Sequence, residues 1–335
     1  MRIGLTFDLQ TDPGDPQQAE FDPPATIDAL EHALASLGHE AVRLGNASEL
    51  LAAPERLRDV ELVFNIAEGN GSRCREAWVP NLLELHGIPY VGSDALALMI
   101  GLDKVLCKRV AITSGIATPT WLKIDHPQEL PAAMGLRFPL IVKPRYEGSG
   151  RGIDAGAVVH DQAALRRRVA WLWQQCRQPM LIEEYISGGE VTVLVIGNDP
   201  PQAYPAIQRP IDPVSGLSCH VAGSAGPVEH PLTLDLALDH HAQAAAVAMY
   251  EAVSCRDMAR VDFRVDAAGQ LFFLEINPLP SFDPAGTIGL LAEYLGITYP
   301  EIIGRILDAA WCRVQGVRRY QISNSRSDID RLGDE

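Results

Sequence analysis

Short apolar runs and helically spaced apolar residues alternate along the first 95 residues of the chain. The runs are too short for helices and stop at turn residues, which predicts strands at residues 2–7, 39–44, 60–66 and 88–92. Helical spacing appears between them and stops at a glycine each time, at residues 25–37 and 76–86. Alternating strands and helices predict parallel strands with crossover helices, and therefore a small open α/β sheet.

The rest of the chain predicts a less regular mixture of helices and strands. Residues 200–231 are rich in Pro, Gly and Ser without any period, and so long a connection usually has a function. The predicted elements are helices at 94–113, 165–173 and 241–252, a last helix ending near Gln315, and strands at 138–142, 180–184, 190–196, 259–265 and 271–276.

The strongest chemical signal is the predicted hairpin ARVDFRVDAAGQLFFLEINPLP. If its strands pair across the turn, Asp262, Glu275 and Asn277 converge, and their hard oxygen atoms suit Mg²⁺ that also binds nucleotide phosphates. The alternative is a pair of solvated surface carboxylates, although Glu275 lies in a very apolar strand and needs a partner there. Alternation assigns Arg260, Asp262 and Arg264 to one face of the first strand, and Leu271, Phe273, Glu275 and Asn277 to one face of the second.

A second signal is FPLIVKPRYEGSGRG, where an apolar strand delivers Lys143 and a glycine-rich loop follows. Backbone N–H groups of such a loop surround phosphate oxygens, since glycine permits close approach, and the lysine adds a point charge. The segment lacks the GK[ST] ending of a Walker motif and is not a GxGxxG helix start. The alternative is a flexible hairpin loop.

Two further segments carry charge next to apolar elements. In LIEEYISGGE, Glu183, Glu184 and Glu190 flank a strand and a glycine turn, which suits a purine edge and ribose hydroxyls; solvated acids at a strand end are the alternative. In GLDKVLCKR, Lys104 and Lys108 lie one helical turn apart, and the alternative is an exposed basic face.

Charge and cysteine usage narrow the class of partner. The formal net charge is −15, which repels phosphate backbones and anionic membrane surfaces, so neither nucleic acid nor a membrane is expected as a partner. The start MRIGLTFDLQTD has no secretory pattern, and no apolar stretch is long enough to span a bilayer. The six cysteines form no CxxC pair, which favours a reducing cytoplasm over a disulfide framework.

Read together and in this order, five segments resemble the ATP-grasp superfamily, and within it the D-alanine:D-alanine ligase branch. The resemblance covers residues 86–280 and implies a fold of α/β and α+β type, in which a small parallel N-terminal domain precedes two α+β domains that enclose a nucleotide. It implies domains at 1–95, 96–182 and 183–318, followed by a tail at 319–335 that we expect to be disordered. The segments are HGIPYVGSDALALMIGLDKVLCKR, GIATPTWL, FPLIVKPRYEGSGRGI, LIEEYISGGEVTVLVIG and ARVDFRVDAAGQLFFLEINPLP.

The resemblance also implies a role for each matching residue. Arg260 and Lys143 would act in catalysis, with Arg260 facing the transferring phosphoryl group. Two Mg²⁺ ions are expected, with Mn²⁺ as the alternative metal. ATP would be held by Lys104, Lys143, Ser149, Gly150, Glu183, Glu184, Ile186 and Glu190, and the metal ions by Asp262, Glu275 and Asn277.

Departures from the ligase pattern are confined to the substrate side. The chain reads FNIAEGNGSR where the ligases carry a His-Gly signature, and Pro280–Asp283 replaces their Pro-Gly-Met-Thr. Glu68, Arg73 and Ser281 are therefore candidate substrate residues: Glu68 for an ammonium and Arg73 for a carboxylate. Residues 205–226 are expected to cover the acyl phosphate.

The predicted function is an ATP-dependent carboxylate-amine ligase that makes an amide or dipeptide through an acyl phosphate. One alternative closes the acyl phosphate intramolecularly into a ring, and another is a nucleotide-binding protein without catalysis. The expected substrates are small carboxylates and amines, which the resemblance implies are amino acids, and a homodimer is an open option.

Overall fold

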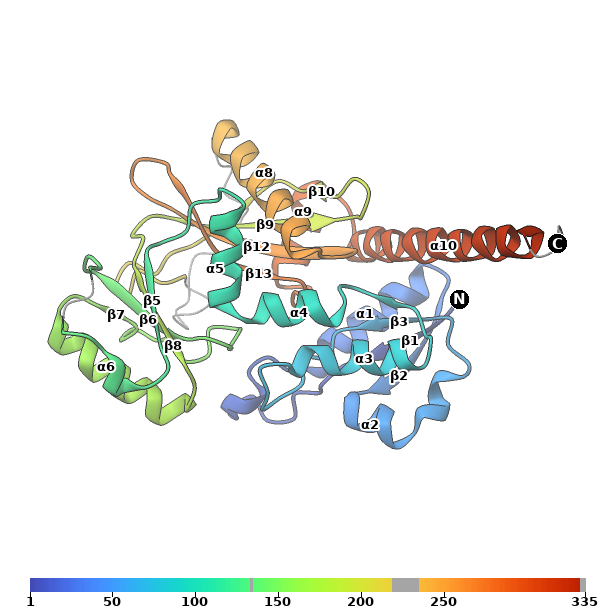
Figure 1. Ribbon diagram of the computed structural model, residues 1–335, viewed down its shortest axis with the longest axis horizontal. Coiled ribbons are helices and arrows are strands. Elements are labelled where there is room, and N and C mark those ends of the chain that lie inside the picture. Colours follow the sequence, from blue (N-terminus) through green and yellow to red (C-terminus); the bar gives the residue numbers. More distant parts are fainter. Residues whose placement is uncertain (133–134, 219–234, 332–335) are drawn as a thin grey trace.

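The computed structural model describes residues 1–132, 135–218 and 235–331, and the strands of this part form three sheets (Figure 1). The sheet of the N-terminal segment has the order β2-β1-β3-β4 and is parallel throughout. This confirms the predicted open parallel sheet. Its strands are β1 (Arg2–Thr6), β2 (Glu40–Gly45), β3 (Leu62–Asn65) and β4 (Tyr90–Val91).

The other two sheets are antiparallel and follow one another along the chain. One has the order β5-β8-β6-β7, and the other has the order β10-β9-β12-β13 with β11 also paired to β9. The first of them is built from β5 (Trp121–Ile124), β6 (Leu140–Pro144), β7 (Val158–Val159) and β8 (Met180–Glu184). The second is built from β9 (Glu190–Ile196), β10 (Gln202–Ala203), β11 (Ile207–Arg209), β12 (Met258–Val265) and β13 (Leu271–Asn277).

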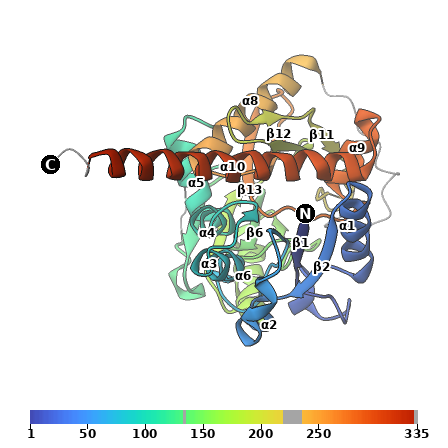
Figure 2. The same cartoon turned by 90° about the vertical axis from the view of Figure 1, so that its right-hand side faces the viewer.

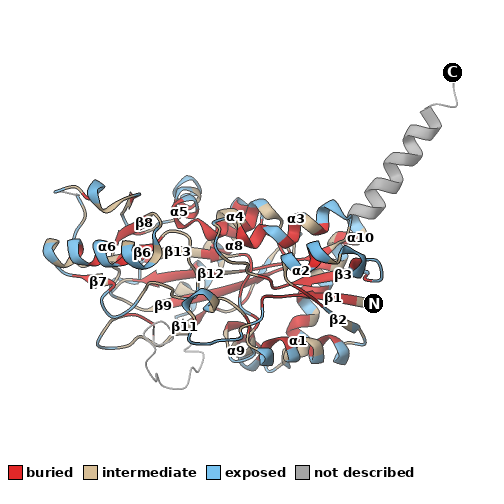
Figure 3. Cartoon of the chain, turned by 90° about the horizontal axis from the view of Figure 1, so that it is seen from below, coloured by how far each residue is buried: buried red, intermediate tan, exposed pale blue. Residues whose placement is uncertain are grey.

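Helices cover these sheets on the sides that carry apolar residues, and Figure 3 shows the buried positions gathered along the strands and the inner helix faces. The amphipathic helix α6 packs on the β5–β8 sheet, and α5 and α8 pack on the sheet of β9 and β12. The helices are α1 (Pro24–Ser36), α2 (Ala47–Ala52), α3 (Trp78–Leu85), α4 (Ala95–Leu102), α5 (Lys104–Thr113), α6 (Gln162–Cys176), α8 (Leu236–Val253), α9 (Thr287–Leu295) and α10 (Tyr299–Arg331).

The N-terminal sheet shares its core with the C-terminal helices. Ile302 and Ile306 of α10 belong to the same buried cluster as Leu30 of α1 and Leu5 of β1. Figure 2 shows α10 passing across α1 and the first sheet. The N-terminal α/β unit therefore depends on residues from the far end of the chain, and the domain limits near residues 95, 182 and 318 stay predictions.

The predicted helix at 94–113 is wrong, because it divides into α4 and α5 at Asp103. The backbone of Asp103 is extended (φ −90°, ψ 95°), and its carboxylate accepts hydrogen bonds from the N–H groups of Val105 and Leu106. The same carboxylate forms a two-point contact with Arg145, whose Nε and Nη2 are each 2.7 Å away. An aspartate with these capping bonds starts a new helix, so Lys104 lies in the first turn of α5.

Other predicted limits also change. Residues 200–231, predicted without regular elements, contain β10 and β11, and α8 begins at Leu236. The last helix, predicted to end near Gln315, runs to Arg331 and so into the expected tail; residues 332–335 lie outside the described part, and disorder of the tail stays a prediction. None of the described helices is long and apolar enough to cross a membrane.

Candidate active site

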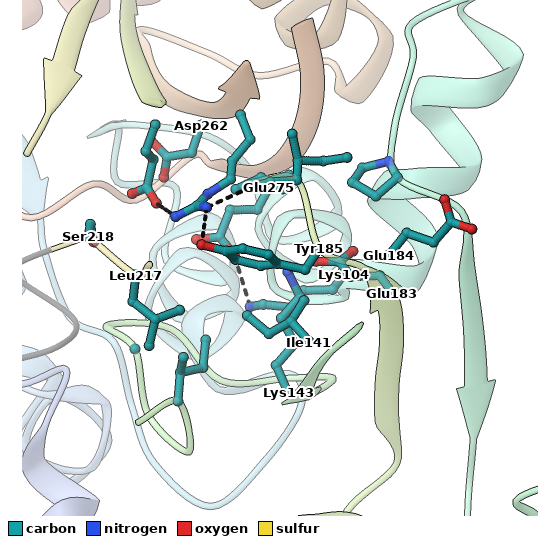
Figure 4. A pocket seen from close by; sticks show the side chains of 17 residues that line it. Lys104, Ile141, Lys143, Glu183, Glu184, Tyr185, Leu217, Ser218, Asp262 and Glu275 are labelled. Atoms are coloured by element: carbon teal, nitrogen blue, oxygen red, sulfur yellow. Dashed lines mark hydrogen bonds and ion pairs between the residues drawn. The ribbon is translucent and has the colours of Figure 1, made fainter. Parts of the chain in front are cut away.

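Two cavities lie next to each other where the three sheets meet. We call the first the inner cavity: it lies between the β5–β8 sheet and the β9–β13 sheet, and Figure 4 shows its lining. We call the second the acidic cavity: it lies between the N-terminal segment and the end of β13. Lys104 and Glu275 line both, so the two cavities share a wall. The predicted residues at the inner cavity are Lys104, Lys143, Gly150, Glu183, Glu184, Ile186, Glu190, Asp262 and Glu275.

Two lysines share one buried carboxylate at the inner cavity. Glu183 pairs with Lys143 through one oxygen and lies 2.7 Å from the Lys108 ammonium through the other. Burial alone would raise the pKa of Glu183, but the two ammonium groups outweigh it and lower that pKa. Burial lowers the pKa of Lys108, which the Glu183 charge opposes. Glu183 is thus a counter-ion of two lysines, and its predicted contact with adenine stays a prediction.

The other acids of this strand have different environments. Glu184 is at the outer end and forms a two-point contact with the exposed Arg137, at 3.2 and 3.0 Å. Glu190 is partly buried and 3.5 Å from Arg264, and burial raises its pKa although Arg264 opposes the shift. Glu184 and Glu190 therefore lie at opposite ends of the region that the sequence assigns to the nucleoside.

Tyr185 extends across the inner cavity in Figure 4, which the sequence did not predict. Its hydroxyl oxygen accepts a hydrogen bond from Arg264 Nη1 at 2.7 Å, and the same nitrogen donates to the carbonyl of Ile186 at 2.8 Å. Arg264 Nη2 also donates to the carbonyl of Gly216, 2.8 Å away. Arg264 thereby fixes the Tyr185 ring and ties the segment after β11 to the cavity wall.

The predicted hairpin is formed, and its pairing brings the expected side chains together. Arg260 faces Asn277 and Asp262 faces Glu275 across the two strands. Asp262 accepts hydrogen bonds from Arg260 Nη2 at 2.9 Å, Asn277 Nδ2 at 3.1 Å and Thr192 Oγ1 at 2.7 Å. The carboxylates and the Asn277 carbonyl oxygen form a set of hard donors on one edge of the hairpin.

One detail of the hairpin was predicted wrongly. The register shifts between Asp262 and Phe263, so that Leu274 is the extra residue of a β-bulge on β13. Phe273 and Leu271 are consequently buried in the core, whereas Leu274 lines the inner cavity beside Glu275. The bulge turns the carboxylate toward the cavity without moving the phenylalanine out of the core.

Lys104 and Glu275 form the ion pair at the shared wall, with 3.0 Å between Nζ and Oε2. Lys104 also donates to the carbonyl of Glu147 at 2.5 Å. Burial would lower the pKa of Lys104, but Glu275 raises it above the ordinary value; burial would raise the pKa of Glu275, and Lys104, Lys143 and Arg260 lower it. Both groups are therefore charged, and the wall between the cavities is an ion pair.

The glycine-rich loop after β6 is held from the N-terminal segment. Glu20 accepts a hydrogen bond from the N–H of Gly148 at 2.7 Å and forms a two-point contact with Arg75, at 2.8 and 2.7 Å. A Cβ at residue 148 would lie 2.5 Å from the Glu20 carboxylate, so a side chain there would displace that carboxylate. Ser149 and Gly150 have positive φ, and Ser149 lines the acidic cavity while Gly150 lines the inner one.

The candidate substrate residues separate into two places. Glu68 and Ser281 line the acidic cavity, together with Arg260 and Asn277. Arg73 is exposed, its guanidinium lies 6.0 Å from the centre of the Tyr146 ring, and it is not among the lining of that cavity. The structure therefore does not bring Arg73 together with Glu68.

Several residues of the acidic cavity were missed by sequence reasoning. Glu20 and Asp22 lie in a loop without periodicity, and Glu76 was assigned to the start of a helix, although it belongs to a short 3-10 helix at Arg75–Ala77. At the inner cavity, Arg264 was also missed, although it carried a usable signal because it shares a strand face with Arg260 and Asp262. Of the expected covering segment, residues 219–226 lie outside the described residues.

Comparisons with known proteins were made by sequence and by structure. A family described as the D-ala D-ala ligase C-terminus matches residues 113–308. A D-alanine–D-alanine ligase of Synechococcus sp. (strain JA-3-3Ab) is 32% identical over 307 residues, which is 89% of this chain and 91% of that protein. One from Syntrophotalea carbinolica is 33% identical over 290 residues, which is 85% and 90% of the two chains.

Among solved structures, the D-alanine–D-alanine ligase of Bacillus anthracis complexed with ATP superposes with a TM-score of 0.74. It is 24% identical, and the match covers 94% of this chain and 98% of that one, so this likeness shows the fold. The fold and these relatives define an enzyme of the ATP-grasp class that forms C–N bonds. Within that class, the chain belongs to the D-alanine–D-alanine ligase family.

Proposed function

We propose that the protein uses ATP to activate a carboxylate as an acyl phosphate and then joins the acyl group to an amine. The observation that carries the proposal is the common wall of the two cavities at Lys104 and Glu275. Nucleotide and amine would meet at this wall from opposite sides, next to Arg260 and Asp262. The relatives named as D-alanine–D-alanine ligases support the same type of bond formation.

The inner cavity is the proposed ATP site. Lys104 and Lys143 supply positive charge for the phosphates, and Ser149 and Gly150 belong to the loop beside them. Phosphoryl transfer depends on position and charge neutralisation more than on covalent chemistry by the protein, and these groups supply both. The nucleoside side is formed by Glu183, Glu184, Ile186 and Glu190.

The residues on the hairpin fit Mg²⁺. Asp262 and Glu275 are carboxylates, and Asn277 donates its N–H to Asp262, which leaves its carbonyl oxygen available as a ligand. These three would hold the metal, whose charge would neutralise the phosphate oxygens when bound. Thr192 and Arg260 orient the Asp262 carboxylate through the hydrogen bonds described above.

The reaction needs two displacements. A substrate carboxylate oxygen bonds to the γ-phosphorus as the bond to the ADP oxygen breaks, and an uncharged amine then bonds to the acyl carbon as phosphate leaves. Arg260 lies at the acidic cavity, where its guanidinium would stabilise the negative charge that develops on the phosphoryl group and on the acyl oxygen. Glu68 and Ser281 are proposed substrate contacts, and the ATP-rich cytoplasm is the proposed compartment.

A reaction with MgATP and pools of amino acids of both chiralities tests the proposal. Phosphate release that needs two substrates, with an amide product identified by mass spectrometry, supports a ligase; release with one substrate would indicate ring closure. We expect Glu275→Gln to abolish product formation with little change in the melting temperature, because it removes charge and almost no volume. Glu251→Gln, on the exposed side of α8, is the control; retained turnover in Glu275→Gln would overturn the metal assignment.

A further inference from the structure

The lining of the acidic cavity contains more acidic side chains than its basic side chains pair with. Its described lining contains two basic side chains, Lys104 and Arg260, and these already pair with Glu275 and Asp262. Four acids of the same lining have no basic side chain within ion-pair distance among the described residues. They are Asp22, Glu68, Glu76 and Asp283.

Two of these acids are buried without any hydrogen-bonding partner. Asp22 and Glu76 are 8% and 7% exposed, and their carboxylates form no hydrogen bond or ion pair within the described part of the chain. Arg75 and Lys104 attract Glu76 from a distance, but their own nitrogens are bonded to Glu20 and Glu275. Both residues line the cavity, so a ligand bound there would supply the hydrogen-bonding partners that their carboxylates lack.

Like charges act on three of the four acids. Asp283 acts on Asp22, Glu20 acts on Glu76, and both Glu76 and Glu20 act on Glu68. Burial is the larger cause, and it raises the pKa of Asp22 to about 7 and that of Glu76 to about 8. Buried carboxyl groups without partners lower the stability of a protein, and a ligand that brings positive charge to them offsets this loss of stability.

The described part of the chain supplies no basic side chain within ion-pair distance of these four acids. The Mg²⁺ proposed above has other ligands, Asp262, Glu275 and Asn277, and residues 219–234 contain no lysine or arginine. An organic cation is therefore the complement that suits these acids.

The reaction itself sets how many cations two substrates retain. The amine that attacks must be uncharged and becomes the amide nitrogen, so two monoamino acids keep one ammonium group between them. One ammonium group does not provide partners for four acids. Resting on the proposed ligase function, we propose that at least one substrate is a basic amino acid, whose side-chain ammonium or guanidinium binds in the acidic cavity between Asp22, Glu68 and Glu76.

Calorimetric binding to the full chain, with Mg²⁺ and a non-hydrolysable ATP analogue present, tests this. The probes are 2,4-diaminobutyrate, ornithine and lysine, each against the amino acid in which a methyl group replaces the side-chain ammonium: norvaline, norleucine and 2-aminoheptanoate. We expect at least one basic probe, in one chirality, to bind tenfold or more tightly than its neutral counterpart. Equal or tighter binding of all the neutral probes would overturn the proposal.

Two variants locate the effect. Glu76→Gln and Asp22→Asn should each reduce the preference for the basic probe about tenfold, whereas Glu55→Gln, which removes the same charge from an exposed position, should preserve it. Preference unchanged in both cavity variants would also overturn the proposal. Since both substitutions replace a buried carboxyl without a partner by an amide of nearly the same volume, the variants should fold as well as the parent.

Product analysis separates this proposal from the ligase proposal. Efficient amide formation with neutral amino acids alone would support the ligase proposal and overturn the proposal of a basic substrate. Glu76-dependent binding of a basic probe, with no amide from any pool, would support the basic ligand and overturn the ligase proposal. If no probe shows a binding preference and no pool gives an amide, both proposals are overturned.

Discussion

Glu183 neutralises two lysines that would otherwise face each other in a dry environment. Lys108 is fully buried and Lys143 nearly so, and among the described residues neither has another carboxylate as close. Lys108 also donates to Thr118 at 2.8 Å, and Thr118 donates to the carbonyl of Phe273, which connects the helix of Lys108 to β13. The position of Lys143 at the inner cavity therefore depends on its ion pair with Glu183.

We expect Glu183→Gln to destabilise the protein by about 3 kcal/mol or more, since removing one partner leaves buried charges unpaired. Urea unfolding followed by fluorescence measures the change. Glu184→Gln is the matched control, because its partner Arg137 is solvent-exposed, and its free energy of unfolding should be almost unchanged. Equal losses in the two variants would show that the lysines have another counter-ion.

The unpaired acids predict how stability depends on pH. Asp22 and Glu76 have pKa values of about 7 and about 8 when folded, against 3.8 and 4.5 ordinarily, so the folded state binds more protons between these limits. Stability therefore falls as pH rises from about 4 to about 8. The charges facing them are Asp8 and Asp283 for Asp22, and Arg75, Glu20 and Lys104 for Glu76.

Melting temperatures from pH 5 to 8.5 check this prediction. Asp22→Asn and Glu76→Gln should each flatten the decline and raise the melting temperature at pH 8, by about 2 °C or more. A parent protein whose stability is constant or rises over this range would show that the two carboxyls already have partners. The effect is measured without any substrate.

At the scale of elements, the hairpin and the parallel sheet could be predicted because each follows from a local period. The break at Asp103 was not predicted. Asp103 caps α5 locally, but Arg145, which holds the same carboxylate, lies 42 residues further along the chain. The bulge at Leu274 was equally hidden: alternation assigns Phe273 and Glu275 to one face, and only packing of the phenylalanine against the core shows that the register changes.

Some residues of the candidate site could likewise be predicted from a local pattern, and others could not. Lys143, Asp262 and Glu275 lie on strands, where period and burial point to them. Glu20 and Asp22 lie in a loop with no pattern, and they reach the site only because the first sheet places that loop against residues of β13 and the glycine-rich loop. Their contribution depends on tertiary contacts, which the sequence does not encode locally.

The helix α10 supplies a test at this scale. Ile306 is fully buried against the N-terminal sheet and α1, so Ile306→Ala should lower the free energy of unfolding by about 2 to 4 kcal/mol. Asp308→Ala, on the exposed side of the same helix, should change it by less than about 0.5 kcal/mol. A small loss at Ile306 would mean that α10 is not part of the shared core.

At the scale of the molecule, Glu20 connects parts that are far apart in the chain. It binds the N–H of Gly148, 128 residues away, and the guanidinium of Arg75, 55 residues away. The N-terminal segment, the loop after β3 and the glycine-rich loop are therefore held by one carboxylate, and the loop beside the phosphates is fixed from the substrate side.

We expect Glu20→Ala to increase amide hydrogen exchange in the loop around Gly148 about tenfold, which matches the loss of a charged hydrogen bond. Glu31→Ala, which removes an exposed ion pair with Arg43, is the control and should leave the loop unchanged. Exchange that is equally slow in Glu20→Ala would mean that other contacts hold the loop closed. Mass spectrometry of peptides covering residues 145–152 provides the measurement.

The common wall of the two cavities has a consequence for inhibition. Because both cavities include Lys104 and Glu275, a nucleotide and an amino acid bound in them would lie end to end. A compound that tethers the two fragments would make the second binding event intramolecular, and a linker of matching length gains about 10²- to 10⁴-fold in affinity without any new contact. Such a bivalent compound would be selective even where each half is a weak and common metabolite.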